Sequence, residues 1–433
     1  MAYDPKFNRL YLGTGNGAPW NRKVRSPGGG DNLFLCSIVA LDADTGRYAW
    51  HYQVNPGETW DYNAAMDIEL ADLTIRGRKR SVLLHAPKNG FFYVIDRRNG
   101  RLLSAEKFAK ATWAQRIDLK TGRPVENPEA RFAGRRGVLL FPGPVGAHAV
   151  APMSFSPATG LVYIPASEQG AVYADPPGDL AQWRPLPNYA INNAIGPADP
   201  PIEVPPPKSS LLAWDPGRQR AVWELPLPGV VNGGTMATAG NLVLQGRATG
   251  EFAAYAADTG RRLWSFDAQA GIQGQPITYL AGGRQYVTVI AGWRSTGRPS
   301  GATPEWEYRL QPRRVLTFVL DGDAALSPPG PRTLPFLDDP QFVVDPAKAA
   351  RGAVLARTRC LLCHGTALAA AGTAPDLRRS AVPLSFELLA DVVIRGSLLS
   401  AGMPRFEVLT AQDVEDLQHD IRQRAREGIA ASQ

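Results

Sequence analysis

The stretch that occupies residues 40–50 reads ALDADTGRYAW, and residues 254–264 repeat it as AYAADTGRRLW. Each copy predicts a strand, a tight turn built on Asp and Gly, and a return strand that ends in tryptophan. In such a turn the acidic side chain caps main-chain amides and the glycine supplies a positive φ, while the tryptophan packs between neighbouring sheets. Because one such unit cannot bury both of its faces, the repeat predicts sheets that stack radially as the blades of a β-propeller.

Shorter copies of the unit occur at 95–100, 117–122 and 213–218, and the last of these runs on to Trp223. Apolar, aromatic-rich runs separated by Gly, Asp and Pro continue to about residue 325 without a long helical period. We therefore expect a mainly β domain over residues 1–325. A β-sandwich built from similar hairpins is the alternative.

A different pattern lies near the C-terminal end, at Cys360-Leu361-Leu362-Cys363-His364. Two thiols at this spacing can attach covalently to one haem, and the histidine behind them then binds the iron. Met403 offers the thioether of a His/Met pair suited to one-electron transfer. The alternatives are two unrelated cysteines in a helix, or half of a zinc site. Residues 347–433 are thus predicted to form an all-α cytochrome c domain.

Residues 326–346 include a proline-rich run and are predicted to be a stiff, solvated linker between the two domains. In the second domain, helical spacing is expected over 347–359 and 410–427, with Thr410 at the N-terminal cap of the second helix. Phe406 and Leu409 are expected to cover the haem.

Charge and composition exclude some functions. The 433 residues carry 47 Lys and Arg against 40 Asp and Glu, a net charge of +7, without a long run of like charges. Scattered charges argue against a nucleic-acid or polybasic membrane surface, although a basic docking face for an acidic redox partner is an alternative. No apolar run is long enough to span a membrane.

Cys36 lies in an apolar run and is expected to be buried as a small hydrophobic residue.

Four further stretches carry a family resemblance: GTGNGAPWN at 13–21, GETWDY at 57–62, APKNGFFYVIDR at 86–97 and GGTMATAG at 233–240. Together they resemble the pyrroloquinoline quinone (PQQ) dependent alcohol dehydrogenases. With the haem-binding pattern behind them, the resemblance is to the quinohaemoprotein branch of that family. It implies a partial eight-bladed β-propeller that holds PQQ and calcium on its axis, followed by an all-α cytochrome c domain.

The resemblance implies roles for particular residues. Asn16 corresponds to a calcium ligand, and Asp61 to the general base that also touches calcium. Lys88 corresponds to a cation placed against the quinone oxygens. Asn63 stands where lanthanide-using relatives carry another carboxylate, so calcium is the expected metal. Simple turn residues at 16 and 61, and a solvent-facing lysine at 88, are the alternatives.

Weaker correspondences concern Gly233, Gly234 and Trp293, which occupy positions that approach PQQ in relatives. Glycines also simply make turns, and a tryptophan at 293 is equally expected to dock one blade on another.

The chain also departs from the family pattern at Ala149, Val150 and Val231, where relatives carry an Asn, a Trp and a Trp. One lost hydrogen bond to PQQ is worth about 1–3 kcal/mol. These changes favour an alternative function, a PQQ-free haem c electron-transfer or docking protein.

The first residues, 1–5, resemble an internal strand of the family, which implies that roughly its first three blades are absent. A calcium-binding Glu, a disulfide ring of adjacent cysteines, an Arg near the quinone and the signal peptide would be absent with them. We expect an open arc of about five blades that aggregates or depends on a further segment. A fragment, a misassigned start and a decayed gene are all consistent with this pattern.

The implied function is the oxidation of primary alcohols to aldehydes with PQQ and calcium, followed by electron transfer to covalently bound haem c. The implied partners are a small alcohol and a downstream electron acceptor, namely a cytochrome, an azurin-like protein or a membrane quinone pathway. Because covalent haem attachment of this kind is a periplasmic chemistry, we expect a periplasmic protein.

The haem prediction can be tested by colour. The chain, exported together with a cytochrome c maturation system, should be purified with the visible bands of a covalently bound haem. A colourless preparation would contradict the assignment of Cys360, Cys363 and His364.

Overall fold

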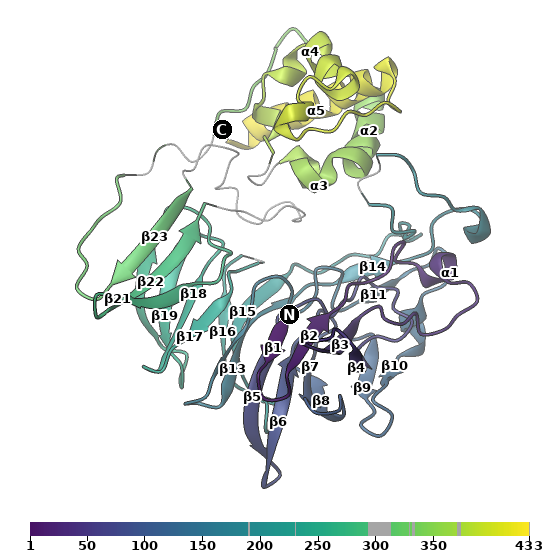
Figure 1. Cartoon of the computed structure of the whole chain (residues 1–433). Helices are drawn as coiled ribbons and strands as arrows, with labels where there is room; N and C mark the ends of the chain where they lie inside the picture. Colours follow the sequence, from purple (N-terminus) through teal and green to yellow (C-terminus); the bar gives the residue numbers. More distant parts are fainter. Residues whose placement is uncertain are drawn as a thin grey trace.

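The computed structural model describes residues 1–188, 191–229, 231–292, 313–328, 330, 334–369 and 374–432. A body of β-sheets occupies the lower part of Figure 1, and a smaller helical unit stands above it. The described strands end at Val319 and the main helices of the upper unit begin at Pro346.

Within the described residues, four antiparallel sheets of four strands and one of three form the blades. The first contains β1 (Ala2–Asp4), β2 (Arg9–Gly13), β3 (Ser37–Asp42) and β4 (Tyr48–Gln53). The second contains β5 (Glu69–Ile75), β6 (Arg78–His85), β7 (Phe91–Asp96) and β8 (Leu102–Lys107). The third contains β12 (Ser154–Ser156), β13 (Leu161–Glu168), β15 (Lys208–Asp215) and β16 (Arg220–Leu227). The fourth contains β17 (Thr235–Ala237), β18 (Leu242–Gly246), β19 (Glu251–Ala256) and β20 (Arg262–Asp267). The fifth contains β21 (Ile277–Ala281), β22 (Arg284–Ala291) and β23 (Arg314–Val319).

This arrangement confirms the predicted propeller and rules out the β-sandwich. The predicted turns also form as expected: Asp42 Oδ1 accepts a hydrogen bond from the Thr45 amide at 2.9 Å, and Gly46 has a φ of 68°.

One copy of the repeat was interpreted wrongly as a propeller unit. Residues 117–122 do form a tight turn, but it joins β9 (Ala114–Ile117) to β10 (Pro124–Glu126) in a sheet of only two strands. A 3₁₀ turn, Pro128–Arg131, comes soon after the short β10, and no further strand of the described part of the chain extends this sheet. A second small sheet pairs β11 (Val138–Leu140) with β14 (Ala171–Tyr173), and the short α1 (Arg22–Arg25) and the 3₁₀ turn Leu180–Gln182 lie in other loops.

Tryptophans lock neighbouring blades together. Trp50 of β4 packs against the turn of the second blade at Gly100. The contact is so close that a Cβ on Gly100 would lie 2.5 Å from the indole ring. Its Nε1 donates to the Arg97 carbonyl at 3.2 Å. Trp223 of β16 makes the same contact with the fourth blade, where a Cβ on Gly260 would lie 2.7 Å from its ring. Glycine is therefore required at these turns both for the positive φ and for the space.

The strand directions bring the long loops to one end of the propeller. Because successive strands run antiparallel, the connections β2–β3, β4–β5 and β6–β7 all leave from the end opposite the Asp–Gly turns. Main-chain hydrogen bonds tie these loops to one another, such as the one from the Ala64 amide to the Thr14 carbonyl at 2.9 Å.

The helical unit contains α2 (Pro346–Leu355), α3 (Leu361–His364), α4 (Phe386–Ala390) and α5 (Ala411–Ser432). Wide turns of π type follow α2 at Ala356–Cys360 and α4 at Asp391–Arg395, and short 3₁₀ turns lie at Thr366–Leu368, Leu377–Arg379, Val382–Leu384 and Leu399–Ala401. The predicted cap of α5 is confirmed, since the Thr410 hydroxyl accepts from the Asp413 amide at 3.2 Å and Asp413 accepts from the Thr410 amide at 2.8 Å. Phe406 and Leu409 are buried in the core of this unit.

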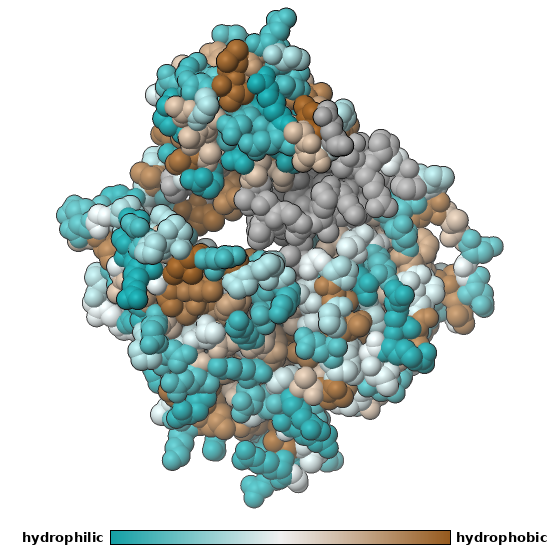
Figure 2. All heavy atoms as spheres, turned by 180° about the vertical axis from the view of Figure 1, so that it is seen from behind, coloured by the Kyte–Doolittle hydropathy of each residue, from teal (hydrophilic) through white to brown (hydrophobic). Residues whose placement is uncertain are grey.

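The helical unit stands over the loop end of the propeller (Figure 1). Asn188, in the loop between β14 and β15, donates to the Arg405 carbonyl at 2.9 Å, and Arg359 donates to the Pro187 carbonyl. Hydrophilic residues cover much of the opposite face in Figure 2, with hydrophobic patches between them. None of the described helices is both long and apolar enough to cross a membrane.

The tryptophan contact gives a stability prediction. Trp50→Ala should lower the free energy of unfolding by about 3–5 kcal/mol, because a buried indole and its support of two blades are lost. Trp264→Ala is the matched control. The Trp264 side chain is 41% exposed, against 6% for Trp50, so this substitution should lower the free energy of unfolding by less. Urea denaturation of both variants measures the difference, and equal losses would contradict the docking role of Trp50.

Candidate functional site

Asp61 and Lys88 form an ion pair at the loop end of the propeller. Lys88 Nζ lies 3.0 Å from Asp61 Oδ2 and 3.1 Å from the Asp61 carbonyl oxygen. Only 13% and 14% of the two side chains are exposed. Burial raises the pKa of the Asp61 carboxyl, and the Lys88 ammonium partly opposes this. A sheltered carboxylate beside one cation is suited to accept a proton from a bound hydroxyl.

Asn16 lies in a neighbouring loop that Cys36 ties to the Asp61 loop. The Cys36 thiol donates to the Tyr62 carbonyl at 2.7 Å and lies 3.8 Å from the Gly15 carbonyl, and its amide donates to the same Gly15 carbonyl at 2.9 Å. Asn16 directly follows Gly15 in the chain, and Asp61 directly precedes Tyr62. Cys36 is buried as predicted, but it also makes polar contacts that the sequence did not indicate.

Asn16 and Asp61 offer oxygen atoms, which are the ligands that calcium accepts. Among the described residues, no group of three His, Cys, Asp or Glu side chains lies close enough to hold a metal ion. Any cation here would therefore depend on amide and main-chain oxygens beside Asp61, which are ligands that calcium accepts. The Asn63 side chain instead accepts weakly from the Ala65 amide at 3.4 Å.

Three further residues, Gly233, Gly234 and Trp293, were predicted to contact PQQ. The structure explains the two glycines by packing and does not describe the tryptophan. A Cβ on Gly233 would lie 2.9 Å from the Gly246 carbonyl oxygen, and one on Gly234 would lie 2.6 Å from Pro152 Cδ. Both glycines are therefore needed for packing, whatever else they contact. Trp293 lies outside the described residues.

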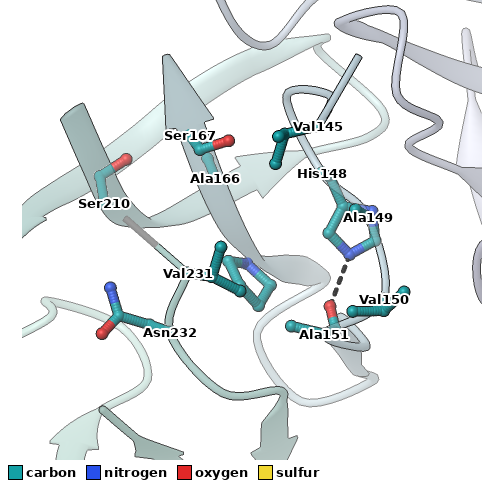
Figure 3. Close-up of a pocket in the computed structure, with 11 residues that line it drawn as sticks. Val145, His148, Ala149, Val150, Ala151, Ala166, Ser167, Ser210, Val231 and Asn232 are labelled. Atoms are coloured by element: carbon teal, nitrogen blue, oxygen red, sulfur yellow. Dashed lines mark hydrogen bonds between the residues drawn. The ribbon is translucent and has the colours of Figure 1, made fainter. Parts of the chain in front are cut away.

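A small pocket of about 30 Å³ brings together the positions at which the chain departs from the family pattern. Ala149, Val150 and Val231 line it, together with Asn232, although they come from two separate loops (Figure 3). The loop that forms one wall of the pocket is tied to the main chain of Lys88, because the Ala147 amide donates to the Lys88 carbonyl at 2.9 Å. Its walls are largely apolar, with the Asn232 amide already bonded to the Ser209 hydroxyl at 3.1 Å.

His148 holds the loop that forms one wall of this pocket. Its Nδ1 lies 2.6 Å from the Ala86 carbonyl and its Nε2 lies 2.8 Å from the Ala151 carbonyl, the contact drawn in Figure 3. Asp67 Oδ1 lies 3.5 Å from Nε2, and burial raises the pKa of this carboxyl. Sequence reasoning passed over both residues, because nothing local in the sequence indicates their contact.

The haem-binding pattern folds as one compact group in the helical unit. His364 is buried, and its Nδ1 lies 2.8 Å from the Pro375 carbonyl, so that this nitrogen carries the proton. Nε2 is buried without a hydrogen-bond partner among the described residues, as an iron-binding nitrogen must be. Cys360 and Met403 pack against the same apolar cluster, and Cys363 is a free, exposed thiol. These residues fit a covalently bound haem.

Fold and site together define a β-propeller redox protein joined to a cytochrome c unit. Residues 1–110 and 209–287 match the family model for the β-propeller domain of glucose, ethanol and alcohol dehydrogenases, named PQQ. Residues 347–419 match the model for subunit III of cbb3-type cytochrome c oxidase.

Curated relatives and solved structures narrow this class. The chain is 47% identical over 439 residues to quinohemoprotein alcohol dehydrogenase ADH IIB of Pseudomonas putida, covering 100% of this chain and 62% of that protein. The structure of ADHIIG from Pseudomonas putida HK5 matches with a TM-score of 0.86 at 39% identity, over 99% of this chain and 64% of that one. The enzyme of Comamonas testosteroni matches with a TM-score of 0.84 at 41% identity, over 98% and 62%. The chain is thus a homologue of the quinohaemoprotein alcohol dehydrogenases along its whole length, and it spans about 60% of the length of the curated relatives it matches.

The ion pair gives a prediction about pH. An aspartate whose pKa is higher in the folded state than in the unfolded state makes stability fall as the pH rises through the interval between the two values. Lys88→Met removes the charge that opposes the rise, so the pKa of Asp61 in the folded state should rise further. The substitution should therefore lower the free energy of unfolding by about 2–3 kcal/mol more at pH 7 than at pH 4. In Asp61→Asn/Lys88→Met this extra pH dependence should vanish. Denaturation of both variants from pH 4 to pH 8 provides the measurement, and a loss independent of pH in the single variant would contradict it.

Proposed function

We propose that this chain takes part in the oxidation of primary alcohols to aldehydes with PQQ and calcium, and passes the electrons to a haem c bound by Cys360 and Cys363. The observation that carries the proposal is the sheltered Asp61–Lys88 pair, with 3.0 Å between Oδ2 and Nζ, at the propeller end over which the helical unit stands. The homology to quinohaemoprotein alcohol dehydrogenases supports it.

The bound groups would divide the chemistry among them: PQQ accepts a hydride, calcium polarises the quinone oxygen, and haem c accepts single electrons. Lys88 would bind PQQ, with Gly233, Gly234 and Trp293 as further proposed contacts. Asn16 and Asp61 would hold calcium. His364 and Met403 would ligate the haem iron, and the unpartnered Nε2 of His364 supports this assignment.

The chain's own residues would act on protons and charges. Asp61 Oδ2 accepts the hydroxyl proton of the alcohol, for which a pKa raised by burial makes it a better base than an exposed aspartate. Lys88 Nζ holds that carboxylate in place through its contacts with both Oδ2 and the carbonyl, and stabilises negative charge that develops beside it. Only 13% of the Lys88 side chain and 14% of the Asp61 side chain are exposed, so the surrounding loops keep most water from these groups.

The proposal also covers the substrate, the electron acceptor, the cellular compartment and the domain boundaries. The substrate is a small alcohol, and the acceptor is a cytochrome, an azurin-like protein or a membrane quinone pathway in the periplasm. The chain divides into a partial propeller at 1–325, a linker at 326–346 and a cytochrome c domain at 347–433. The end of that linker packs on the helical unit, where Leu337 bonds through its amide to the Arg378 carbonyl at 3.1 Å and through its carbonyl to Arg422 at 3.0 Å.

A second candidate function is haem c electron transfer or docking without PQQ. The apolar lining of the pocket by Ala149, Val150 and Val231 favours it, because these side chains offer no hydrogen bond to a polar cofactor.

The two functions are separated by following the haem. The purified chain, supplied with PQQ, calcium and ethanol, should reduce its haem at the visible bands, and Asp61→Asn should slow this reduction by about 100-fold or more. Asp44→Asn, in an exposed turn, is the matched control and should reduce haem normally. Reduction without added PQQ, or no reduction with it, would favour the second candidate.

A further inference from the structure

Two side chains that the proposed chemistry does not use lie directly behind the site. Glu58 is in the β4–β5 loop, three residues before Asp61, and is completely buried. Arg25 ends helix α1, in the β2–β3 loop that also carries Asn16. Each contacts the main chain around a proposed calcium ligand without contacting that ligand's side chain.

Glu58 clamps the turn that presents Asp61. Its Oε1 accepts from the Trp60 amide at 2.5 Å and from the Tyr62 amide at 3.0 Å, the two amides on either side of Asp61. Asp61 itself has a φ of 66°, in the left-handed region that a side chain disfavours. The surrounding structure must therefore impose this conformation, and the two hydrogen bonds of Glu58 do so.

Arg25 ties the loop of Asn16 to the same turn. Its Nη1 donates to the carbonyls of Pro19 at 2.6 Å and Trp20 at 2.8 Å, and its Nη2 donates to the Glu58 carbonyl at 2.5 Å. Gly17, which follows Asn16, leaves room for the guanidinium, since a Cβ there would lie 2.5 Å from Arg25 Nε. One planar cation thus bridges three carbonyls of the two loops, a geometry that lysine cannot reproduce.

The charges of the two residues are consistent with this arrangement. Burial raises the pKa of Glu58 to about 7, and the charge of Arg25 is the largest influence that opposes it. Near neutral pH a neutral side chain with the same oxygen is therefore a fair substitute for Glu58 in the clamp.

We propose that Arg25 and Glu58 are positioning residues, which hold Asn16 and Asp61 at a fixed separation so that both can reach one cation. The inference rests on the proposed calcium site and deepens it.

The test compares variants of the full chain by two measurements. Hydrogen exchange reports protection of the amides in residues 13–20 and 57–64, and sensitised luminescence of terbium, used alone as a calcium probe, reports cation binding near Trp60. The variants are Glu58→Ala, Glu58→Gln, Arg25→Ala and Arg25→Lys. The controls are Glu129→Gln and Arg101→Ala, whose side chains are exposed.

Glu58→Ala should lose protection in 57–64, and both Arg25 variants should lose it in 13–20, with the rest of the chain unchanged. Glu58→Gln should keep the protection, because its carbonyl oxygen still accepts from both amides. Terbium should bind at least about tenfold more weakly to Glu58→Ala and Arg25→Ala, but not to Glu58→Gln or the controls.

Protection that survives Glu58→Ala, or that Glu58→Gln loses equally, would overturn the inference, as would uniform loss across the whole chain. Failure of the calcium site is recognised separately: the unaltered chain would then bind terbium no better than Asp61→Asn. Hydrogen exchange would still decide whether Arg25 and Glu58 order the two loops.

Discussion

The stacking of a tryptophan on the glycine turn of the next blade is the contact on which the rest of the propeller depends. Trp50 on Gly100 and Trp223 on Gly260 hold neighbouring sheets side by side, each through ring contact and one indole hydrogen bond. With the sheets so placed, an even number of antiparallel strands returns the chain to the same end after each four-stranded blade. Loops far apart in the sequence are therefore gathered at one end, which is where the candidate site lies.

That loop end differs from the body of the sheets in what it buries. The sheets bury mainly aliphatic and aromatic side chains, whereas the loops bury Glu58 and largely shelter Asp61, Lys88 and Asp67, each of which is held by hydrogen bonds or an ion pair. Burying charge is costly, and proteins accept that cost mainly where a carboxylate or ammonium has chemistry to perform. A cation beside Asp61 and Asn16 would offset part of this cost, so the apolar framework and the polar site make opposite contributions to stability.

Sequence patterns predicted what local chemistry determines. The Asp–Gly turn at Asp42 and the cap at Thr410 each depend on residues a few positions apart, and each formed as expected. The hairpin around 117–122 shares the turn chemistry of the blades, but its neighbours lack the strands that would make it one. The roles of Glu58 and Arg25 were not predicted, because their contacts form only when two loops distant in the sequence come together. No spacing of residues within either loop indicates that these loops are in contact.

The hydrogen bond between His364 and the Pro375 carbonyl has a consequence for how the cytochrome unit matures. Pro375 is held in place by its neighbour Asp376, whose carboxylate accepts from Arg378 at 2.9 and 2.7 Å. The imidazole is thus aimed, and its tautomer chosen, by the polypeptide alone. An incoming porphyrin would therefore meet an imidazole whose Nε2, the nitrogen left for the iron, is already deprotonated.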